Sequence, residues 1–422
     1  MLQDTSRRQP ARGASAAPFA PAPPAGHVPP AGWVAPASRA EAWPAATQPP
    51  AASKPAASKP AARKRGRDPL WARLMVVLGA LLMMASGGAI VGGKVMIGQY
   101  SGAIEQRDLL GNAGVSHVSV DGPLNILLVG IDARPNSNEL TRSDSIIIAH
   151  INAKHDQAFL MSIPRDLAVR IPAYPRTGYK GGTEKINAAF AFGSQGKGGR
   201  EGGVELLALT IQQSVAPGIK FDGGAIVDFG GFQALVNALG GVDMCIDQRV
   251  TSIHVGTDRK GKFLSPDRGG KPVVYEPGCR RLEPWQALDY VRQRHLPNGD
   301  YDRARHQQQF VKAMVKEAKK QGIATNPIKL NNVMTAAGKA LTVDKNGVKI
   351  EDWLFTLSGV INNDPVMLKT NAGKINSVRV GSEEAESLTP ESRAMFQAAT
   401  ADALDQFVMA NPTFVATDGA IG

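Results

Sequence analysis

The chain of 422 residues contains only two cysteines, Cys245 and Cys279, which excludes a zinc site built on cysteine pairs. It has no HExxH and no GxSxG motif, so the usual residues of a zinc hydrolase or a serine hydrolase are missing. The glycine-rich segment 193–203 follows a predicted helix and contains neither a dinucleotide fingerprint nor a P-loop. We expect that segment to be a flexible surface loop.

Net positive charge is scarce outside the N-terminal tail. Residues 1–73 hold 11 Lys or Arg and 3 Asp or Glu, a net +8, whereas the rest of the chain holds 37 and 34, a net +3. A nucleic-acid-binding domain is expected to carry its positive charge on the folded part. The distribution therefore predicts no nucleic-acid partner.

The first 93 residues show the composition of a tail followed by a membrane anchor. Residues 1–62 are mostly Ala, Pro, Gly and Ser, which cannot bury enough apolar surface to fold, so we predict a disordered tail over 1–73. Segment 74–93 has no charged residue and is long enough to span a bilayer. A cleaved signal peptide is the alternative, although the region before the apolar run is far longer than an ordinary signal-peptide n-region.

The basic residues just before the anchor favour a cytoplasmic N-terminus. The sequence thus predicts a single-pass protein of the cell membrane, with a transmembrane helix at 74–93, an extracellular stalk at 94–117 and an extracellular folded domain at 118–412. Outside the membrane, the pair Cys245 and Cys279 indicates a disulfide, with two unrelated buried thiols as the alternative.

The folded part has the pattern of an α/β protein. Segments 124–130, 145–151 and 158–163 are continuous apolar runs of strand length, which predicts a sheet covered on both faces. We therefore expect a layered α-β-α domain with a central mixed sheet. Further elements are predicted as helices at 186–192, 204–215, 231–239, 327–341, 349–360 and 390–410, strands at 242–246 and 375–380, and a loop at 251–275.

Charged residues stand at the ends of three of the predicted strands. Asp132 comes after the first, Asp144 precedes the second, and Arg165 follows the third. Adjacent strands would bring both carboxylates to one edge of the sheet, where two carboxylates beside a phosphate are a usual way to hold Mg²⁺. Alternatively, each Asp caps a turn or pairs with a neighbouring arginine.

The segment 290–310, YVRQRHLPNGDYDRARHQQQF, concentrates arginines. Arg292 and Arg294 follow a strand-like run at 287–291, so in extended chain they point to the same face. Several guanidinium groups suit a phosphate di-anion, whereas the alternative is a surface network of ion pairs.

A helix is predicted to follow the turn at 298–299. Asp300 can cap it, and Gly322 can end it just after residue 321. Asp300, Arg303 and Gln307 would form one stripe on this helix. Taken together, the strand ends and this stripe predict a magnesium-assisted phosphate or pyrophosphate site.

Six motifs in order resemble the LytR-CpsA-Psr family of bacterial cell-envelope proteins. They are NILLVGIDAR at 125–134, RSDS at 142–145, SIPRD at 162–166, KINAAFAFG at 185–193, VDFGGFQALVNALGGVD at 227–243, and LDYVRQRH with GDYDRARHQQQ at 288–309. The similarity is close over about 124–320 and looser to near residue 410.

The resemblance implies a phosphotransferase of cell wall assembly, of the kind that attaches teichoic acid or arabinogalactan. Its partners would be a glycopolymer on a polyprenyl diphosphate and the peptidoglycan that accepts the glycopolymer with its phosphate. Asp132 and Asp144 match the family's aspartates for Mg²⁺, for which Mn²⁺ could substitute. The family's pyrophosphate-contacting residues correspond to Arg165, Arg292, Arg294, Arg303 and Gln307. The aspartate that orients those residues corresponds to Asp300.

Some points stay open. His306 stands where many members have another arginine, which a protonated histidine could partly replace. The general base could be Asp132, Asp144 or Asp166. Seven apolar residues could line a channel for the lipid: Phe190, Phe192, Leu206, Ile211, Phe229, Phe232 and Leu235. The alternative is that they belong to the ordinary hydrophobic core. Alternative functions are a transcriptional regulator or attenuator without catalysis and a hydrolase of the lipid diphosphate.

Overall fold

The computed structural model describes residues 105–115, 120–132, 141–323, 341–344 and 363–416, together with 329, 332–333, 335–336, 353 and 359–360. The predicted tail and transmembrane segment lie outside these residues, as do almost all of the predicted helices at 327–341 and 349–360. Within the described residues, no helix combines the length and the apolar character needed to cross a membrane.

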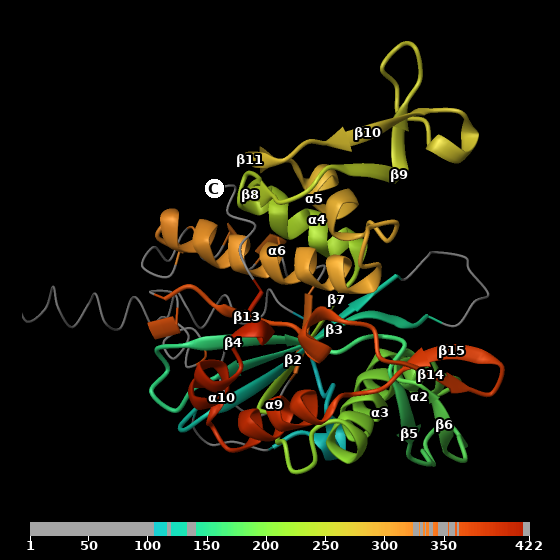
Figure 1. Cartoon of the computed structure of the whole chain (residues 1–422), viewed down its shortest axis with the longest axis vertical. Helices are drawn as coiled ribbons and strands as arrows, with labels where there is room; N and C mark the ends of the chain where they lie inside the picture. Colours follow the sequence, from blue (N-terminus) through green and yellow to red (C-terminus); the bar gives the residue numbers. More distant parts are fainter. Residues whose placement is uncertain are drawn as a thin grey trace, which may run out of the picture. The chain divides into compact units, whose positions relative to one another are not determined.

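A mixed sheet forms the centre of the described part, as predicted (Figure 1). Its seven strands are ordered β1-β12-β7-β2-β3-β4-β13. β2 runs antiparallel to β3 and parallel to β7, and β3 runs antiparallel to β4. The bounds are β1 Glu105–Arg107, β2 Leu124–Ile131, β3 Ser143–Ile151, β4 Ala158–Ser162, β7 Gly223–Val227, β12 Leu341–Asp344 and β13 Val366–Leu368.

Helices cover both faces of this sheet (Figure 1). On one face lie α2 Asn187–Gly193, α3 Gly199–Ser214, α9 Pro390–Thr400 and α10 Leu404–Ala410. On the other lie α4 Phe229–Ala238, α5 Pro284–Val291 and α6 Asp300–Lys320. The layered α-β-α architecture predicted from the apolar strands is therefore confirmed.

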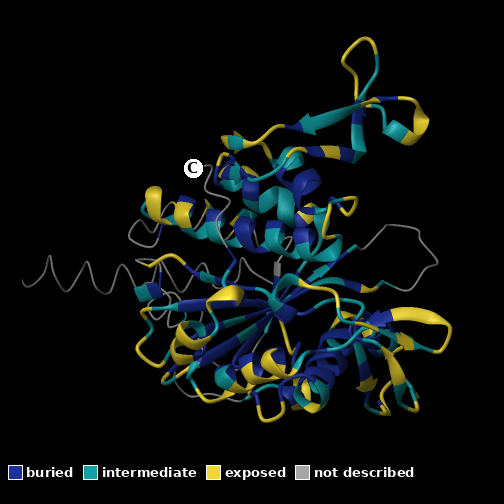
Figure 2. Ribbon diagram, in the orientation of Figure 1, coloured by how far each residue is buried: buried dark blue, intermediate teal, exposed yellow. Residues whose placement is uncertain are grey.

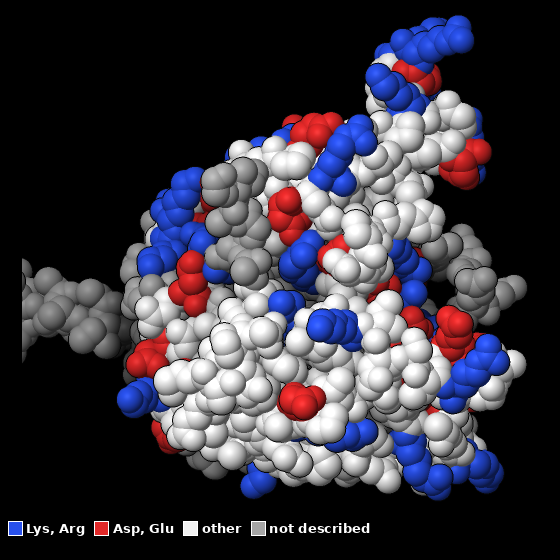
Figure 3. All heavy atoms as spheres, in the orientation of Figure 1, with Lys and Arg blue, Asp and Glu red and all other residues white. Residues whose placement is uncertain are grey.

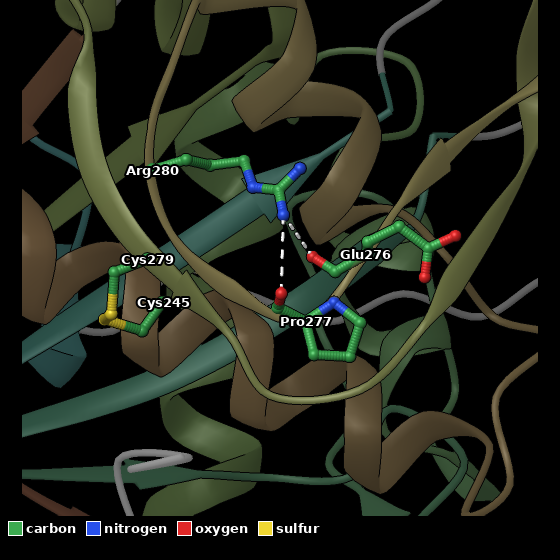
Figure 4. The surroundings of a disulfide bond; sticks show 5 residues. All are labelled: Cys245, Glu276, Pro277, Cys279 and Arg280. Atoms are coloured by element: carbon green, nitrogen blue, oxygen red, sulfur yellow. Dashed lines mark hydrogen bonds between the residues drawn. A yellow bond between two sulfur atoms is a disulfide. The ribbon is translucent and has the colours of Figure 1, made fainter.

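Smaller two-stranded sheets surround the main one. They pair β5 Ala168–Ile171 with β6 Gly182–Lys185, β8 Val242–Ile246 with β11 Gly278–Leu282, β9 Val250–Thr257 with β10 Lys271–Tyr275, and β14 Ser377–Val380 with β15 Glu383–Glu386. The predicted disulfide is confirmed, because Cys245 and Cys279 face each other across β8 and β11 and are bonded (Figure 4).

The main core lies between the sheet and the face covered by α2, α3 and α9. Alternate residues of β2, such as Leu127 and Val129, pack there against Phe190 and Leu206 of the helices. The sheet and these helices hold most of the buried residues in Figure 2. Leu109 and Leu110, within the range predicted as the stalk, are buried in this core, 0% and 1% exposed.

Three local predictions were wrong. The run 287–291 is not strand-like but the end of α5, because a capping box of Glu283 and Gln286 and a proline in its first turn start a helix upstream. The segment 251–275, predicted as a loop, forms the hairpin of β9 and β10. The glycine-rich segment is loop only in part, since α3 begins at Gly199.

Candidate active site

A cavity of about 380 Å³ lies between the sheet and the helices α4 and α6. Most of its wall is apolar: Leu128 and Ile147 come from the sheet, Phe232 and Leu235 from α4, and Met314 from α6. Further lining residues are Asp132, Asp144, His254, Arg292, Arg294, Arg303 and Gln307. The cavity therefore combines an apolar wall with a set of charged groups.

The carboxylates lie at one edge of the sheet, as expected from the sequence. Asp132 follows the last residue of β2 and Asp144 is the second residue of β3, and these two strands pair directly. The strands approach closely here, since a Cβ on Gly130 would lie only 2.9 Å from that of Ser145. Close pairing of the two strands thus places both aspartates on the same cavity.

Asp300 connects two of the predicted arginines. Its Oδ2 accepts hydrogen bonds from Arg165 Nε at 2.8 Å and from Arg303 Nη2 at 2.7 Å. Burial alone would lower the pKa of Arg165, but the carboxylates of Asp300, Asp166 and Asp144 raise it. Asp300 is the first residue of α6 and not its N-cap, which is Gly299 with a positive φ of 55°.

The two arginines that follow α5 reach the aspartates. Arg294 Nη2 donates to Asp144 Oδ2 at 3.1 Å, and Asp144 Oδ1 accepts from Arg165 Nη1 at 3.0 Å. Arg292 lies 3.9 Å from Asp132 Oδ2, and its guanidinium sits 3.9 Å above the ring of Phe229. The structure therefore brings all of the predicted charged site residues into one cluster.

Arg303 is the most buried member of this cluster, only 4% exposed. Its Nη2 donates to Asp300 and to the carbonyl oxygen of Asp144, whereas its buried Nε and Nη1 have no hydrogen-bond partner among the described residues. Burial, followed by the charges of Arg165 and Arg294, lowers its pKa to about 10, so it stays protonated at neutral pH. A buried cation with two unpaired donors is costly unless an anion is bound beside it.

Only part of the predicted lipid-channel set lines the cavity. Phe229, Phe232 and Leu235 do. Phe190, Leu206 and Ile211 are instead buried in the main core, and Phe192 packs against that core. The reason is topological: α2 and α3 cover the opposite face of the sheet from α4 and α6.

The proposal that His306 replaces an arginine at the phosphates does not fit the structure. His306 is fully buried, stacks on Tyr290 with ring centroids 4.3 Å apart, and lies 3.3 Å from Asp247 Oδ1. It is absent from the cavity wall. Its neighbour Arg305 likewise pairs with Asp247 and Asp302, so both side chains anchor α6.

Two residues near the cluster were missed from the sequence. His254 of β9 lines the cavity, and burial together with the charge of Arg292 lowers its pKa. Lys369 lines a small second pocket on the other side of Arg303, and burial lowers its pKa too. The strand pattern of β9 could have placed His254 on the same face as Ser252, and so indicated it as a site residue. Lys369 follows a strand of only three residues, which has no clear sequence pattern.

The cavity thus joins an apolar wall to a cluster of guanidinium and carboxylate groups. The chain belongs to the LytR_cpsA_psr family, whose family model matches residues 96–391.

Two relatives of the chain bear different names. The polyisoprenyl-teichoic acid–peptidoglycan teichoic acid transferase TagU of Oceanobacillus iheyensis is 28% identical over 312 residues, which cover 72% of this chain and 86% of that protein. The regulatory protein MsrR of Staphylococcus aureus is 31% identical over 202 residues, 47% of this chain and half of that protein.

The fold is also similar to that of a solved structure. The structure of TagT bound to LIIa-WTA is 21% identical and matches with a TM-score of 0.50, covering 71% of this chain and 100% of that one. At this identity the likeness concerns the fold alone.

Proposed function

We propose that this protein transfers a glycopolymer, together with its phosphate, from a polyprenyl diphosphate carrier to a hydroxyl group of peptidoglycan. The observation that carries the proposal is Arg303, a buried guanidinium beside an apolar cavity, with two donors that no described residue pairs. An anionic diphosphate would satisfy those donors, and a polyprenyl chain would occupy the apolar part. The name of the relative TagU agrees with this assignment.

The chemistry follows from charge and position. The acceptor oxygen attacks the phosphorus next to the glycan, the bond from that phosphorus to the bridging oxygen breaks, and polyprenyl monophosphate leaves. Arg165, Arg292, Arg294 and Arg303 would bind the phosphate oxygens and neutralise the charge that develops on them. The hydroxyl proton passes to a carboxylate, for which Asp132 and Asp144 on the cavity are better placed than Asp166 beside Lys185.

Asp132 and Asp144 fit Mg²⁺, and Mn²⁺ as its substitute, in one particular way. Among the described residues, no group of three or more His, Cys, Asp or Glu could hold a metal ion by itself. Mg²⁺ needs only one or two carboxylates, because water and phosphate oxygens complete its shell. The bound metal would supply positive charge to a diphosphate at a site where Asp132, Asp144 and Asp300 offset most of the charge of four arginines.

The placement of the protein in the cell is part of the proposal. Residues 74–93 would anchor it in the cell membrane as a single-pass protein, with a disordered cytoplasmic tail at 1–73 and the catalytic domain outside. A polyprenyl donor and peptidoglycan would both be accessible there. Labelling of cysteines introduced on either side of 74–93 with an impermeant reagent would test it, and labelling of the tail in intact cells would contradict it.

The test of the transferase is a reaction of the full chain with a labelled polyprenyl-diphosphate glycan and peptidoglycan fragments, with Mg²⁺ or with EDTA. Arg303→Lys keeps the charge but loses the planar fork of donors, and Arg249→Ala serves as the control because Arg249 is an exposed arginine outside the cavity. We expect label on peptidoglycan from the wild type and the control, and almost none from Arg303→Lys or with EDTA.

Two other functions predict different outcomes. Free phosphorylated glycan without any conjugate would indicate the hydrolase. Absence of turnover by a folded protein that still binds the lipid would favour a regulator, the role in the name of MsrR. A regulator that binds nucleic acid would need a basic folded surface on the cytoplasmic side, where the chain offers only its tail.

A further inference from the structure

The hairpin of β9 and β10, residues 250–275 and hereafter the arm, carries an excess of positive charge. It contains five Lys or Arg and two Asp, a net +3, which equals the net charge of all residues from 74 to 422. In Figure 3 the projecting end of the hairpin carries basic side chains, with acidic side chains beside them. Residues 74–422 outside the arm therefore carry equal numbers of basic and acidic residues, whereas the arm has a net positive charge.

The cations at the tip are held on a fixed turn. Asp258 Oδ1 accepts hydrogen bonds from the backbone N–H of Lys260 and of Lys262, and the backbone N–H of Asp258 donates to the carbonyl of Lys262. Asp258 is thus used by the turn itself, and no carboxylate of the described residues forms an ion pair with Arg259, Lys260 or Lys262. All three side chains are exposed and available to an anionic partner.

An aromatic platform lies directly beside these cations. Phe263 follows Lys262 and is 62% exposed, one of three large apolar side chains so exposed among the described residues. Its ring packs edge to face on Trp285, with centroids 5.1 Å apart, and Trp285 Nε1 donates to Glu283 Oε2 at 2.8 Å. Two rings fixed in this way offer apolar surface against which the aliphatic face of a sugar can pack.

The root of the arm is joined to the segment that carries the site arginines. Asp289 of α5 accepts hydrogen bonds from Ser252 of β9 at 2.9 Å and from Tyr275 of β10 at 2.8 Å. Gln293, between Arg292 and Arg294, accepts from the backbone N–H of Ile253 at 3.0 Å. His254, two residues further from the root than Ser252, lines the cavity itself. One continuous strand therefore runs from the cavity wall to the basic tip.

The disulfide closes the base of the arm. Cys245 and Cys279 bracket it in sequence, and Arg280 donates to the carbonyls of Glu276 and Pro277 in the turn beside the bond (Figure 4). The arm is a closed loop fastened at both ends. The base of the arm is thus fixed to β8 and β11.

We propose that the tip of the arm binds the anionic glycan chain of the donor, beyond the phosphates held in the site. This inference rests on the proposed function. Several cations spaced along a hairpin suit an anion that repeats along a polymer, and the platform of Phe263 and Trp285 suits sugar rings. A membrane surface is the other polyanion to consider, but a ring packed edge to face on Trp285 beside the acidic Glu283 fits a sugar better than a lipid interface.

The test is the affinity of the full chain for poly(ribitol phosphate) free of lipid, measured for three variants. Lys260→Ala with Lys262→Ala removes two cations of the tip, and Phe263→Ala removes the platform. Lys197→Ala with Arg393→Ala is the matched control, since it removes two exposed cations elsewhere. We expect roughly five- to tenfold weaker binding for each tip variant and less than about twofold for the control.

Two results would overturn the proposal. One is equal binding of the polymer by the tip variants and the control. The other is a loss confined to vesicles of phosphatidylglycerol, which would assign the tip to the membrane. Turnover of a donor with a short glycan is measured in parallel: its absence in the wild type contradicts the transferase, whereas unchanged polymer binding in the tip variants contradicts only the role of the arm.

Discussion

At the scale of single residues, the site is a set of arginines whose positions depend on shared carboxylates. Asp300 holds Arg165 and Arg303, and Asp144 holds Arg165 and Arg294. The sequence predicted which residues belong together, because each follows or begins an element at the same edge of the sheet. No local pattern links Asp300 to Arg165, which is 135 positions away, so only the family resemblance implied that Asp300 orients this arginine.

Asp300→Asn tests whether that carboxylate positions the arginines. The amide keeps the size but loses the charge that Arg165 and Arg303 share. We expect turnover to fall by roughly 10–100-fold and the KM for the lipid donor to rise, because both guanidinium groups would lose their fixed orientation. Steady-state kinetics check this, with circular dichroism to show that the fold persists. Wild-type kinetics would mean that packing alone orients the arginines.

At the scale of elements, α6 is the helix on which the site depends. Asp302 accepts hydrogen bonds from Asn298, and Arg305 pairs with both Asp302 and Asp247, which joins the start of α6 to the segment after β8. The sequence predicted this helix from its capping aspartate to near residue 321, and α6 spans Asp300–Lys320. The prediction for the neighbouring α5 was wrong, because the residues that start this helix, 283–286, lie before the apolar run 287–291.

Acid should loosen this anchor. Burial would raise the pKa of Asp302, but hydrogen bonds from Asn298 and the charge of Arg305 lower it overall. A carboxyl group with a lowered pKa stabilises the fold above its unfolded value of about 3.9, and this stabilisation is lost as the pH falls through the folded value.

Urea unfolding between pH 7 and pH 3 measures the effect. We expect the free energy of unfolding to fall most steeply below pH 4. Asp302→Asn should lower it by about 1–3 kcal/mol at pH 7 and make the acid decline shallower. A variant whose pH profile runs parallel to that of the wild type would exclude Asp302 as a source of acid sensitivity.

The disulfide should stabilise the β8–β11 pair. Its cysteines are 34 positions apart, so replacing both with serine should cost roughly 3–4 kcal/mol of unfolding free energy. The measurement is thermal or urea unfolding with and without a reductant. The reductant should destabilise the wild type and leave the double variant unchanged. Equal sensitivity in both would show that the bond does not carry the stabilisation.

At the scale of the whole molecule, the sheet separates a packed core from a cavity. The apolar strands predicted the sheet and its two covered faces, but not which face would be solid. The sequence could not tell Phe232 of the cavity wall from Phe190 of the core, because both are aromatic residues on short, largely apolar helices. Which of the two phenylalanines lines the cavity depends on the order of the strands and on the face of the sheet that each helix covers.

A pair of substitutions distinguishes wall from core. Leu235→Trp places bulk in the cavity, so we expect about tenfold weaker binding of a long-chain polyprenyl diphosphate with little loss of stability. Leu206→Trp overpacks the core and should destabilise the fold by about 1–3 kcal/mol. Lipid binding and thermal unfolding of both variants give the comparison. Unimpaired lipid binding by Leu235→Trp would mean that the chain binds elsewhere.

The most direct measurement follows the phosphate next to the glycan. A polyprenyl-diphosphate glycan labelled only in that phosphate is given to the full chain with peptidoglycan and Mg²⁺, and every product is separated. Transfer as described here predicts label in a phosphodiester on peptidoglycan and unlabelled polyprenyl monophosphate. Label that stays on the lipid or appears only on free glycan would contradict it.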